Sequence, residues 1–193
     1  MPLSITYQSV KNYQYEIMAE TSSIVDQLIT GNKKAQQYFY TNHYNRFMQI
    51  ALRYVSTQSE AMTIVNDSFL KIFKSIGKLE NTDSLNSWSA SLVRNTTLDY
   101  VRKKVKYDQR HTDIEEIHTV TINEALQSLS MQEILKQIHS LNDKERIVFS
   151  MYAIDGYKHK EISSTLNISE GTSKWYLNQA RRNLKELLKP YML

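Results

Sequence analysis

The chain has 193 residues, 41% of them hydrophobic, and no cysteine, which excludes global disorder, a disulfide framework and a thiolate metal site. Lysine and arginine number 24 against 20 aspartates and glutamates, so the formal net charge of +4 is mildly basic. The first residues lack the basic-then-apolar order of a signal peptide, and no apolar run reaches the roughly eighteen residues that span a bilayer. We therefore expect a cytoplasmic protein without membrane insertion.

Glycine and proline are rare, at 4 and 2 residues, and apolar residues recur between them at spacings of three and four. This period is typical of amphipathic helices, so the predicted fold class is all-α. The period fails in the middle of the chain, which indicates two helical domains joined by a flexible linker. The expected divisions are an extension at 1–23, a first domain at 24–104, a linker at 105–129 and a second domain at 130–190.

The first domain is predicted to contain four helices. They cover 24–29, 33–55, 59–75 and about 88–102, with a loop at 77–87. Gly31 and Asn32 form a pair suited to ending the first helix in the left-handed conformation. Ser59 is placed to cap the third helix. The outer face of the fourth helix is basic.

The second domain is predicted to contain a helix-turn-helix. Capping-box patterns place helix starts at Ser130 and Asn142, and Gly156 is suited to ending the helix that follows Asn142. Asn167 tolerates the left-handed backbone of a tight turn, and Ser169 is placed to cap the last helix. A helix, a tight turn and a second helix form the layout of a DNA-binding helix-turn-helix.

Gly171 is an unexpected residue in the first turn of that last helix. Glycine costs about 1 kcal/mol relative to alanine inside a helix. A missing side chain would let the helix come close to the preceding helix or to a DNA backbone, whose phosphates a helix N-terminus favours. Both explanations are open at this point.

Positive charge is concentrated in two blocks, at 94–110 and 174–189, and acidic residues gather between them. Two basic blocks that flank an acidic one indicate two surfaces that face polyanions.

Three stretches resemble the extracytoplasmic-function sigma factors, which direct bacterial RNA polymerase to promoters. "LNDKERIVFSMYAIDGYKHKEISSTLNISEGTSKWYLNQARRNLKELL" resembles their C-terminal promoter-reading domain. "SLNSWSASLVRNTTLDYVRKK" resembles the helix that melts and reads the downstream promoter element, and "SEAMTIVNDSFLKIFKSI" the helix that docks on the polymerase clamp. The resemblance implies core RNA polymerase and promoter DNA as partners, without a cofactor. It leaves open an inhibitory anti-sigma protein as a further partner.

The resemblance also implies three groups of contact residues. Those for the upstream promoter element are Thr172, Lys174, Trp175, Asn178, Gln179, Arg181 and Arg182. Those for the downstream element are Asn81, Asp83, Asn86, Arg94, Asn95, Arg102 and Lys103. Those for the polymerase are Asn66, Asp67, Phe69 and Lys71. Asparagine and glutamine pair with adenine and lysine favours guanine, whereas the arginines of the last helix are expected on phosphates.

Two residues of the helix-turn-helix depart from the pattern of the family. Asn167 stands where many members have glycine, a change that the left-handed turn tolerates. Ser173 stands where valine is common, which predicts a slightly underpacked inner face of the last helix.

Enzyme chemistry has no support in the sequence. The five histidines share no metal-ligand spacing and pair with no nucleophile and base, and no phosphate-binding glycine loop is present. Two alternatives to a sigma factor are a dimeric helix-turn-helix regulator that acts without polymerase and a helical adaptor that binds only proteins. The first leaves the second basic domain unexplained, and the other leaves the basic last helix unexplained.

Overall fold

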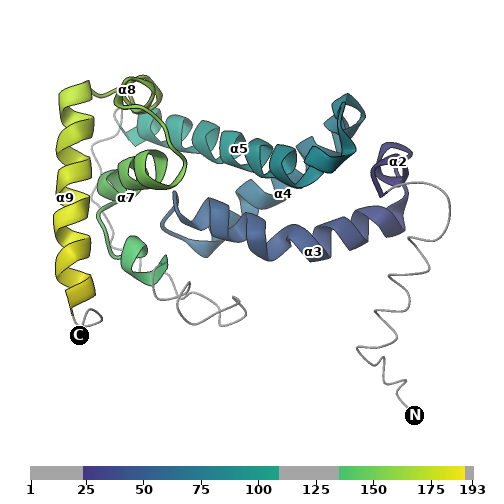
Figure 1. The fold of residues 1–193 in the computed structure, drawn as a ribbon, viewed down its shortest axis with the longest axis horizontal. Helices are drawn as coiled ribbons and strands as arrows, with labels where there is room; N and C mark the ends of the chain where they lie inside the picture. The colour runs from purple at the N-terminus through teal and green to yellow at the C-terminus, as the bar shows by residue number, and fades with distance from the viewer. Residues whose placement is uncertain (1–23, 109–134, 190–193) are drawn as a thin grey trace, which may run out of the picture.

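The structure is a computed structural model that describes residues 24–108 and 135–189, and Figure 1 shows how its helices are arranged. All regular structure in these two ranges is helical, which confirms the all-α prediction. No helix within them is long and apolar enough to cross a bilayer. The predicted extension at 1–23, most of the predicted linker and the predicted helix start at Ser130 lie outside the described residues.

Three long helices of the first domain run beside one another (Figure 1). The domain consists of α2 (Ile24–Ile29), α3 (Lys33–Leu52), α4 (Gln58–Ser75), α5 (Leu85–Asp108) and the 3-10 turns η1 (Ile76–Lys78) and η2 (Thr82–Ser84). Aromatic rings fill the space between α3 and α4: Phe39 and Phe69 meet edge to face, with centroids 6.1 Å apart. Helix α5 continues to Asp108, past the predicted start of the linker at 105.

The boundary between α2 and α3 follows the predicted glycine-asparagine pair. Gly31 has a φ of +73°, which confirms its left-handed conformation. The Asn32 N–H donates to the Gln27 carbonyl at 2.9 Å, so the pair ends α2 as predicted. Asn32 also begins α3, because its side chain accepts hydrogen bonds from the backbone N–H groups of Lys34 and Ala35.

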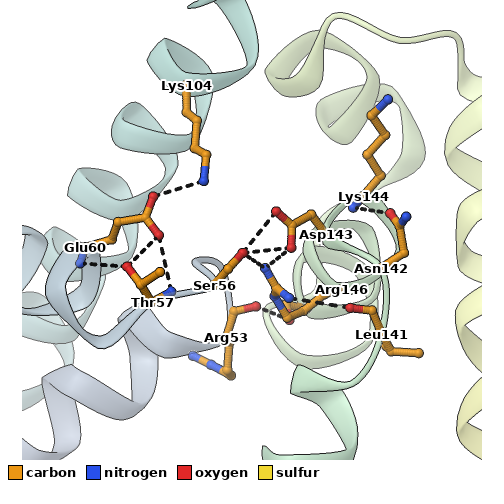
Figure 2. Close-up of polar contacts among 11 residues, drawn as sticks. Arg53, Ser56, Thr57, Glu60, Lys104, Leu141, Asn142, Asp143, Lys144 and Arg146 are labelled. Carbon is orange, nitrogen blue, oxygen red and sulfur yellow. Dashed lines mark hydrogen bonds and ion pairs between the residues drawn. The ribbon is translucent and has the colours of Figure 1, made fainter. Parts of the chain in front are cut away.

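The predicted cap of α4 at Ser59 is wrong. Thr57 caps this helix in a capping box, in which the Glu60 N–H donates to the Thr57 hydroxyl at 3.2 Å and the Glu60 carboxylate accepts from Thr57. Glu60 also accepts a hydrogen bond from Lys104 of α5 at 3.0 Å (Figure 2). Tyr100, on the same helix, donates a further one at 3.1 Å. Burial raises the pKa of Glu60, but these hydrogen bonds and the Lys104 charge outweigh it and lower the pKa overall. One carboxylate thus joins the start of α4 to α5.

The second domain has the predicted helix-turn-helix. The described part of this domain consists of helical residues 135–139, α7 (Asp143–Phe149), the π-helical turn η3 (Ser150–Ile154), α8 (His159–Leu166) and α9 (Glu170–Leu188). The helix-turn-helix itself is formed by α8 and α9. Gly156 and Asn167 have φ values of +77° and +53°, which confirms both predicted left-handed turns. Ser169 caps α9 by accepting from the Thr172 N–H at 2.9 Å.

The capping box predicted to begin at Asn142 is only half formed. The Asn142 side chain accepts from the Lys144 N–H at 3.0 Å and so begins α7. Glu145, the expected second half of the box, accepts a hydrogen bond from Asn183 of α9 at 2.8 Å instead. The carboxylate therefore links α7 to α9, which lies along the outer edge of this domain (Figure 1).

The two domains pack against each other and share a hydrophobic cluster. From the first domain it contains Tyr54, Leu98 and Val101, and from the second Ile147, Val148, Met151, Ile162, Leu166 and Leu177. The end of α5 lies against α8 in the same region (Figure 1). Because helices of both domains contribute to one buried cluster, part of each domain's apolar surface is covered by the other.

Polar side chains of the two domains also meet at this interface (Figure 2). The Ser56 hydroxyl donates to Asp143 at 2.8 Å, and the Arg146 guanidinium donates to both Ser56, at 2.9 Å, and Asp143, at 2.6 Å. Burial raises the pKa of Asp143, but the Arg146 charge and these hydrogen bonds lower it overall. Asp143 therefore stays ionised within the interface.

A second polar group lies at the same interface. Asp155 pairs with Arg53 at 3.5 Å and accepts a hydrogen bond from the Tyr54 hydroxyl. Burial and the nearby carboxylate both raise the pKa of Tyr54, which keeps its proton on the hydroxyl. The Ser150 hydroxyl also donates to the Arg53 carbonyl at 3.1 Å, so backbone and side chains of α3's end are held by the second domain.

Candidate nucleic-acid and polymerase interfaces

Helix α9 presents one polar face to solvent and one apolar face to the protein. The inner positions Ser173, Leu177, Ala180 and Leu184 are buried. On the outside, Lys174, Trp175 and Asn178 are exposed, and Trp175 is 54% exposed. Gln179 and Thr172 are half-buried beside them, and Arg181 and Arg182 are exposed further along the helix. The outward face therefore carries every residue proposed for the upstream element.

Ser173 has a polar role on the inner face of α9. Its side chain is completely buried, and its hydroxyl is hydrogen bonded to Nδ1 of His159 at 2.9 Å. The serine thus joins α9 to the first residue of α8 by a polar contact, which an aliphatic side chain could not make. The sequence pattern missed this pairing because the two residues lie on different helices.

The structure reduces the explanations for Gly171 to one. Within the described part of the chain, a Cβ atom built at this position would meet only the Ser169 hydroxyl, at an ordinary contact distance of 3.6 Å. Close packing against α8 therefore does not require glycine. An approach from outside the chain, such as a DNA backbone at the start of α9, is the explanation that stays open.

The proposed downstream contacts on α5 lie on its surface. Asn95, Arg102 and Lys103 are exposed, and Arg94 is half-buried with its guanidinium donating to Ser91 at 2.7 Å. Arg102 pairs with Asp99 on the same helix at 2.7 Å, and about half of each side chain is exposed. Such a surface pair contributes little to stability, so Arg102 can exchange it for a phosphate.

Two asparagines hold the loop before α5 and the first turn of that helix. The Asn81 side chain accepts from the Asp83 N–H at 2.9 Å and so begins η2. The Asn86 carboxamide oxygen is 2.8 Å from Nε2 of His43 on α3. Asn81, Asp83 and Asn86 are all exposed. The loop is thus held in one shape while its polar edges remain open to solvent.

The proposed polymerase-binding residues do not all share one surface. Asn66, Asp67 and Lys71 are exposed on α4, but Phe69 is 2% exposed and packs in the aromatic core. A direct contact by Phe69 is therefore wrong in this conformation, since a ring at that position of the helix faces α3. Its contribution is to hold α4 in place.

Two exposed apolar residues on α4 escaped the sequence reasoning. Leu70 is 58% exposed and Met62 is 42% exposed. Both lie outside the buried stripe of the helix, and that displacement from the apolar period is the signal that could have found them. Exposed apolar side chains beside Asn66 and Asp67 are typical of a protein-binding surface.

No group of three or more metal-ligating side chains that could hold an ion is present in the described ranges.

Comparison with protein families gives two matches that follow the domain order. Residues 39–107 match the model of Sigma-70 region 2, and residues 131–184 match that of Sigma-70 region 4. The ECF RNA polymerase sigma-E factor of Haemophilus influenzae is 22% identical over 182 residues, which cover 88% of this chain and 96% of that protein. The chain is a sigma factor of the extracytoplasmic-function family. As such, it binds core RNA polymerase and promoter DNA in transcription initiation.

The chain is also similar to other sigma factors, in sequence and in fold. RNA polymerase sigma factor SigZ of Bacillus subtilis is 27% identical over 149 residues, which cover 75% of the chain and 84% of SigZ. Among solved structures, the sigma factor RpoE bound to the anti-sigma factor NepR from Bartonella quintana shares the fold. Its TM-score is 0.50 at 23% identity, with 79% of this chain and 96% of that chain covered. The two alternatives, a dimeric regulator and a protein adaptor, do not account for a region 2 and a region 4 in one chain.

Proposed function

We propose that the sigma factor divides promoter recognition between its two domains. The first domain, residues 24–104, binds the polymerase through α4 and holds the opened downstream element with α5 and the loop before it. The second domain, residues 130–190, binds the upstream element as duplex DNA through α9, and residues 105–129 connect the two. The sigma factor acts by binding, without catalysis of its own, in the cytoplasm where polymerase and DNA are found.

The observation that carries this proposal is that α9 is amphipathic, with one buried face and one polar face exposed to solvent. Its apolar and small residues are buried against α7 and α8, and its amide, basic and indole side chains point to solvent. A duplex major groove accepts one helix whose outer side chains reach base edges. The exposed Asn95 and the shaped loop at α5 supply polar edges instead, which suits unstacked bases of a single strand.

An inhibitory protein is a further proposed partner. The Bartonella quintana sigma factor that shares this fold is bound to an anti-sigma factor. Exposed Leu70 and Met62 on α4 offer apolar area that such an inhibitor and the polymerase would both use. Binding of the inhibitor would then exclude the polymerase.

Transcription in vitro tests this function. Purified core polymerase is assayed on genomic fragments with and without the sigma factor, and we expect specific transcripts only when it is present. Asp67→Arg should weaken binding to core polymerase in a titration, because it reverses a charge on the exposed face of α4. Glu186→Arg makes the same charge change on α9 and should leave core binding unchanged. Equal affinities for the parent and Asp67→Arg, with the helical content retained, would contradict the role of α4.

A further inference from the structure

Three side chains from three successive elements of the second domain stack on one another. Tyr152 of η3 and His159 of α8 have ring centroids 4.5 Å apart and planes at 24°. The guanidinium group of Arg181 of α9 lies over the same tyrosine ring, with its carbon atom 5.7 Å from the ring centroid. The stack therefore connects the element before the helix-turn-helix with both of its helices.

The π-helical turn accounts for the position of Tyr152. The Asp155 N–H donates to the Ser150 carbonyl at 3.0 Å, a wider turn than an α-helix makes. One extra residue in a turn redirects the following side chains by about 100°, and such turns are frequent at functional sites. Tyr152 is 37% exposed, so its ring is a surface feature and not part of the core.

His159 is the second residue in contact with the Tyr152 ring. Its ring lies against Tyr152, and its Nδ1 is hydrogen bonded at 2.9 Å to the buried Ser173 of α9. The imidazole is thus held by two independent contacts. Because Ser173 and Arg181 both belong to α9, the stack holds this helix at two points two turns apart.

The contact with Tyr152 has its largest expected effect on the side chain of Arg181. Among the described residues it forms no ion pair with a carboxylate, and it is exposed on the polar side of α9. A long arginine side chain that is exposed to solvent samples many rotamers, and the loss of this freedom on binding opposes association. An aromatic face beneath the guanidinium restricts those rotamers beforehand and leaves the N–H edge available for a phosphate.

We propose that Tyr152 and His159 are positioning residues for DNA binding, which hold Arg181 in the orientation that meets a phosphate of the upstream element. The inference rests on the proposed function of α9 as the duplex-binding helix. Tyr152 itself need not touch DNA, since its effect passes through Arg181. Removal of the tyrosine ring should therefore weaken DNA binding only in a chain that still has Arg181.

A double-mutant cycle in promoter binding by the full-length sigma factor with core polymerase tests this consequence. Tyr152→Leu keeps an apolar side chain but removes the aromatic face, and it should weaken binding about two- to five-fold, the range for an exposed cation–π contact. Tyr152→Phe keeps the face and should bind as the parent does. In the Arg181→Ala background, Tyr152→Leu should add no further loss. His159→Ala should show the same dependence on Arg181.

Salt dependence and thermal unfolding complete the test. Arg181→Ala should lower the salt slope of binding by about one phosphate. Additive losses from Tyr152→Leu and Arg181→Ala, or parental binding by Tyr152→Leu, would overturn the positioning role. A lowered unfolding temperature that accounts for the loss in Tyr152→Leu would overturn it too. Failure of the proposed function has a different signature, in which Lys174→Ala and Arg182→Ala also leave promoter affinity unchanged.

Discussion

At the scale of the residue, Gly171 destabilises its helix relative to alanine, and this cost in stability is explained by the proposed contact with DNA. Among the described residues, no atom requires a glycine there, since a Cβ would meet only the Ser169 hydroxyl at 3.6 Å. We expect Gly171→Ala to raise the free energy of unfolding by up to about 1 kcal/mol, because alanine favours the helix. The same change should weaken promoter binding, since in the proposed complex the added methyl group would face the DNA backbone. Urea unfolding and a binding titration measure the two effects.

Gly77→Ala is the matched control for this prediction. Gly77 also has open space around it and lies in η1, in the other domain from α9. It should leave upstream DNA binding unchanged. If Gly171→Ala bound the promoter as tightly as the parent, close approach of DNA to the start of α9 would be contradicted.

We expect His139 to make the stability of the fold depend on pH. Both of its ring nitrogens are buried without a hydrogen-bond partner in the described part of the chain. Burial, with the Arg146 charge, lowers its pKa from 6.5 to about 4, and Asp143 opposes this in part. As the pH falls below about 6.5, the unfolded chain therefore binds a proton that the folded chain does not. Stability should fall between about pH 6.5 and pH 4 for this reason.

Denaturant unfolding across this pH range measures the effect. His139→Leu removes the titrating ring and keeps an apolar side chain, so its stability should vary less with pH in that window. The difference between the two pH profiles isolates the contribution of His139 from that of the carboxylates. Two parallel profiles would show that the ring is protonated as easily in the folded state as in the unfolded one.

At the scale of the element, α9 separates base reading from phosphate contact along one helix. Lys174 and Asn178 lie four residues apart on the exposed face, and Arg182 lies one further turn toward the C-terminus. Alanine at Lys174 or Asn178 should cost about 1–3 kcal/mol and relax the preference at particular upstream bases. Arg182→Ala should weaken all sequences alike and lower the salt slope by about one phosphate.

Titrations over a base-substituted promoter series, at several salt concentrations, distinguish these outcomes. Arg182→Ala serves as the reference for a loss without sequence information. Equal losses on every promoter from Lys174→Ala and Asn178→Ala would show that this face binds DNA without reading its sequence.

At the scale of the whole molecule, the interface between the domains is a structural unit of its own. Asp155 is 5% exposed as a side chain and pairs with Arg53, which is 13% exposed. Asp155→Ala leaves this arginine and the Tyr54 hydroxyl without their acceptor, so it should cost about 3–5 kcal/mol of stability. Calorimetry should also show weaker coupling between the unfolding of the two domains.

Asp99→Ala provides the control on the surface. The Asp99–Arg102 pair has about half of each side chain exposed, so its loss should cost less than about 1 kcal/mol. Similar unfolding curves for Asp155→Ala and Asp99→Ala would mean that the interdomain carboxylate contributes no more than a surface charge.

Local interactions let the sequence by itself determine the helices, most of their ends and the family. Asn167, Gly156 and Ser169 act within a few residues of their own position, so the turn and cap of the helix-turn-helix were predictable. The shift of the α4 cap from Ser59 to Thr57 shows the limit, because both residues suit a cap and neighbouring geometry selects one.

Only the tertiary structure decided what joins these elements. The Tyr54–Asp155 hydrogen bond connects residues 101 positions apart, and the Ser173–His159 contact joins two helices whose rotation no local pattern specifies. The resemblance placed Phe69 among the polymerase contacts, but its ring is 2% exposed and packs against Phe47 of α3. A side chain's partner across an interface follows from the packing of whole helices, and the helical period records only which side of each helix is apolar.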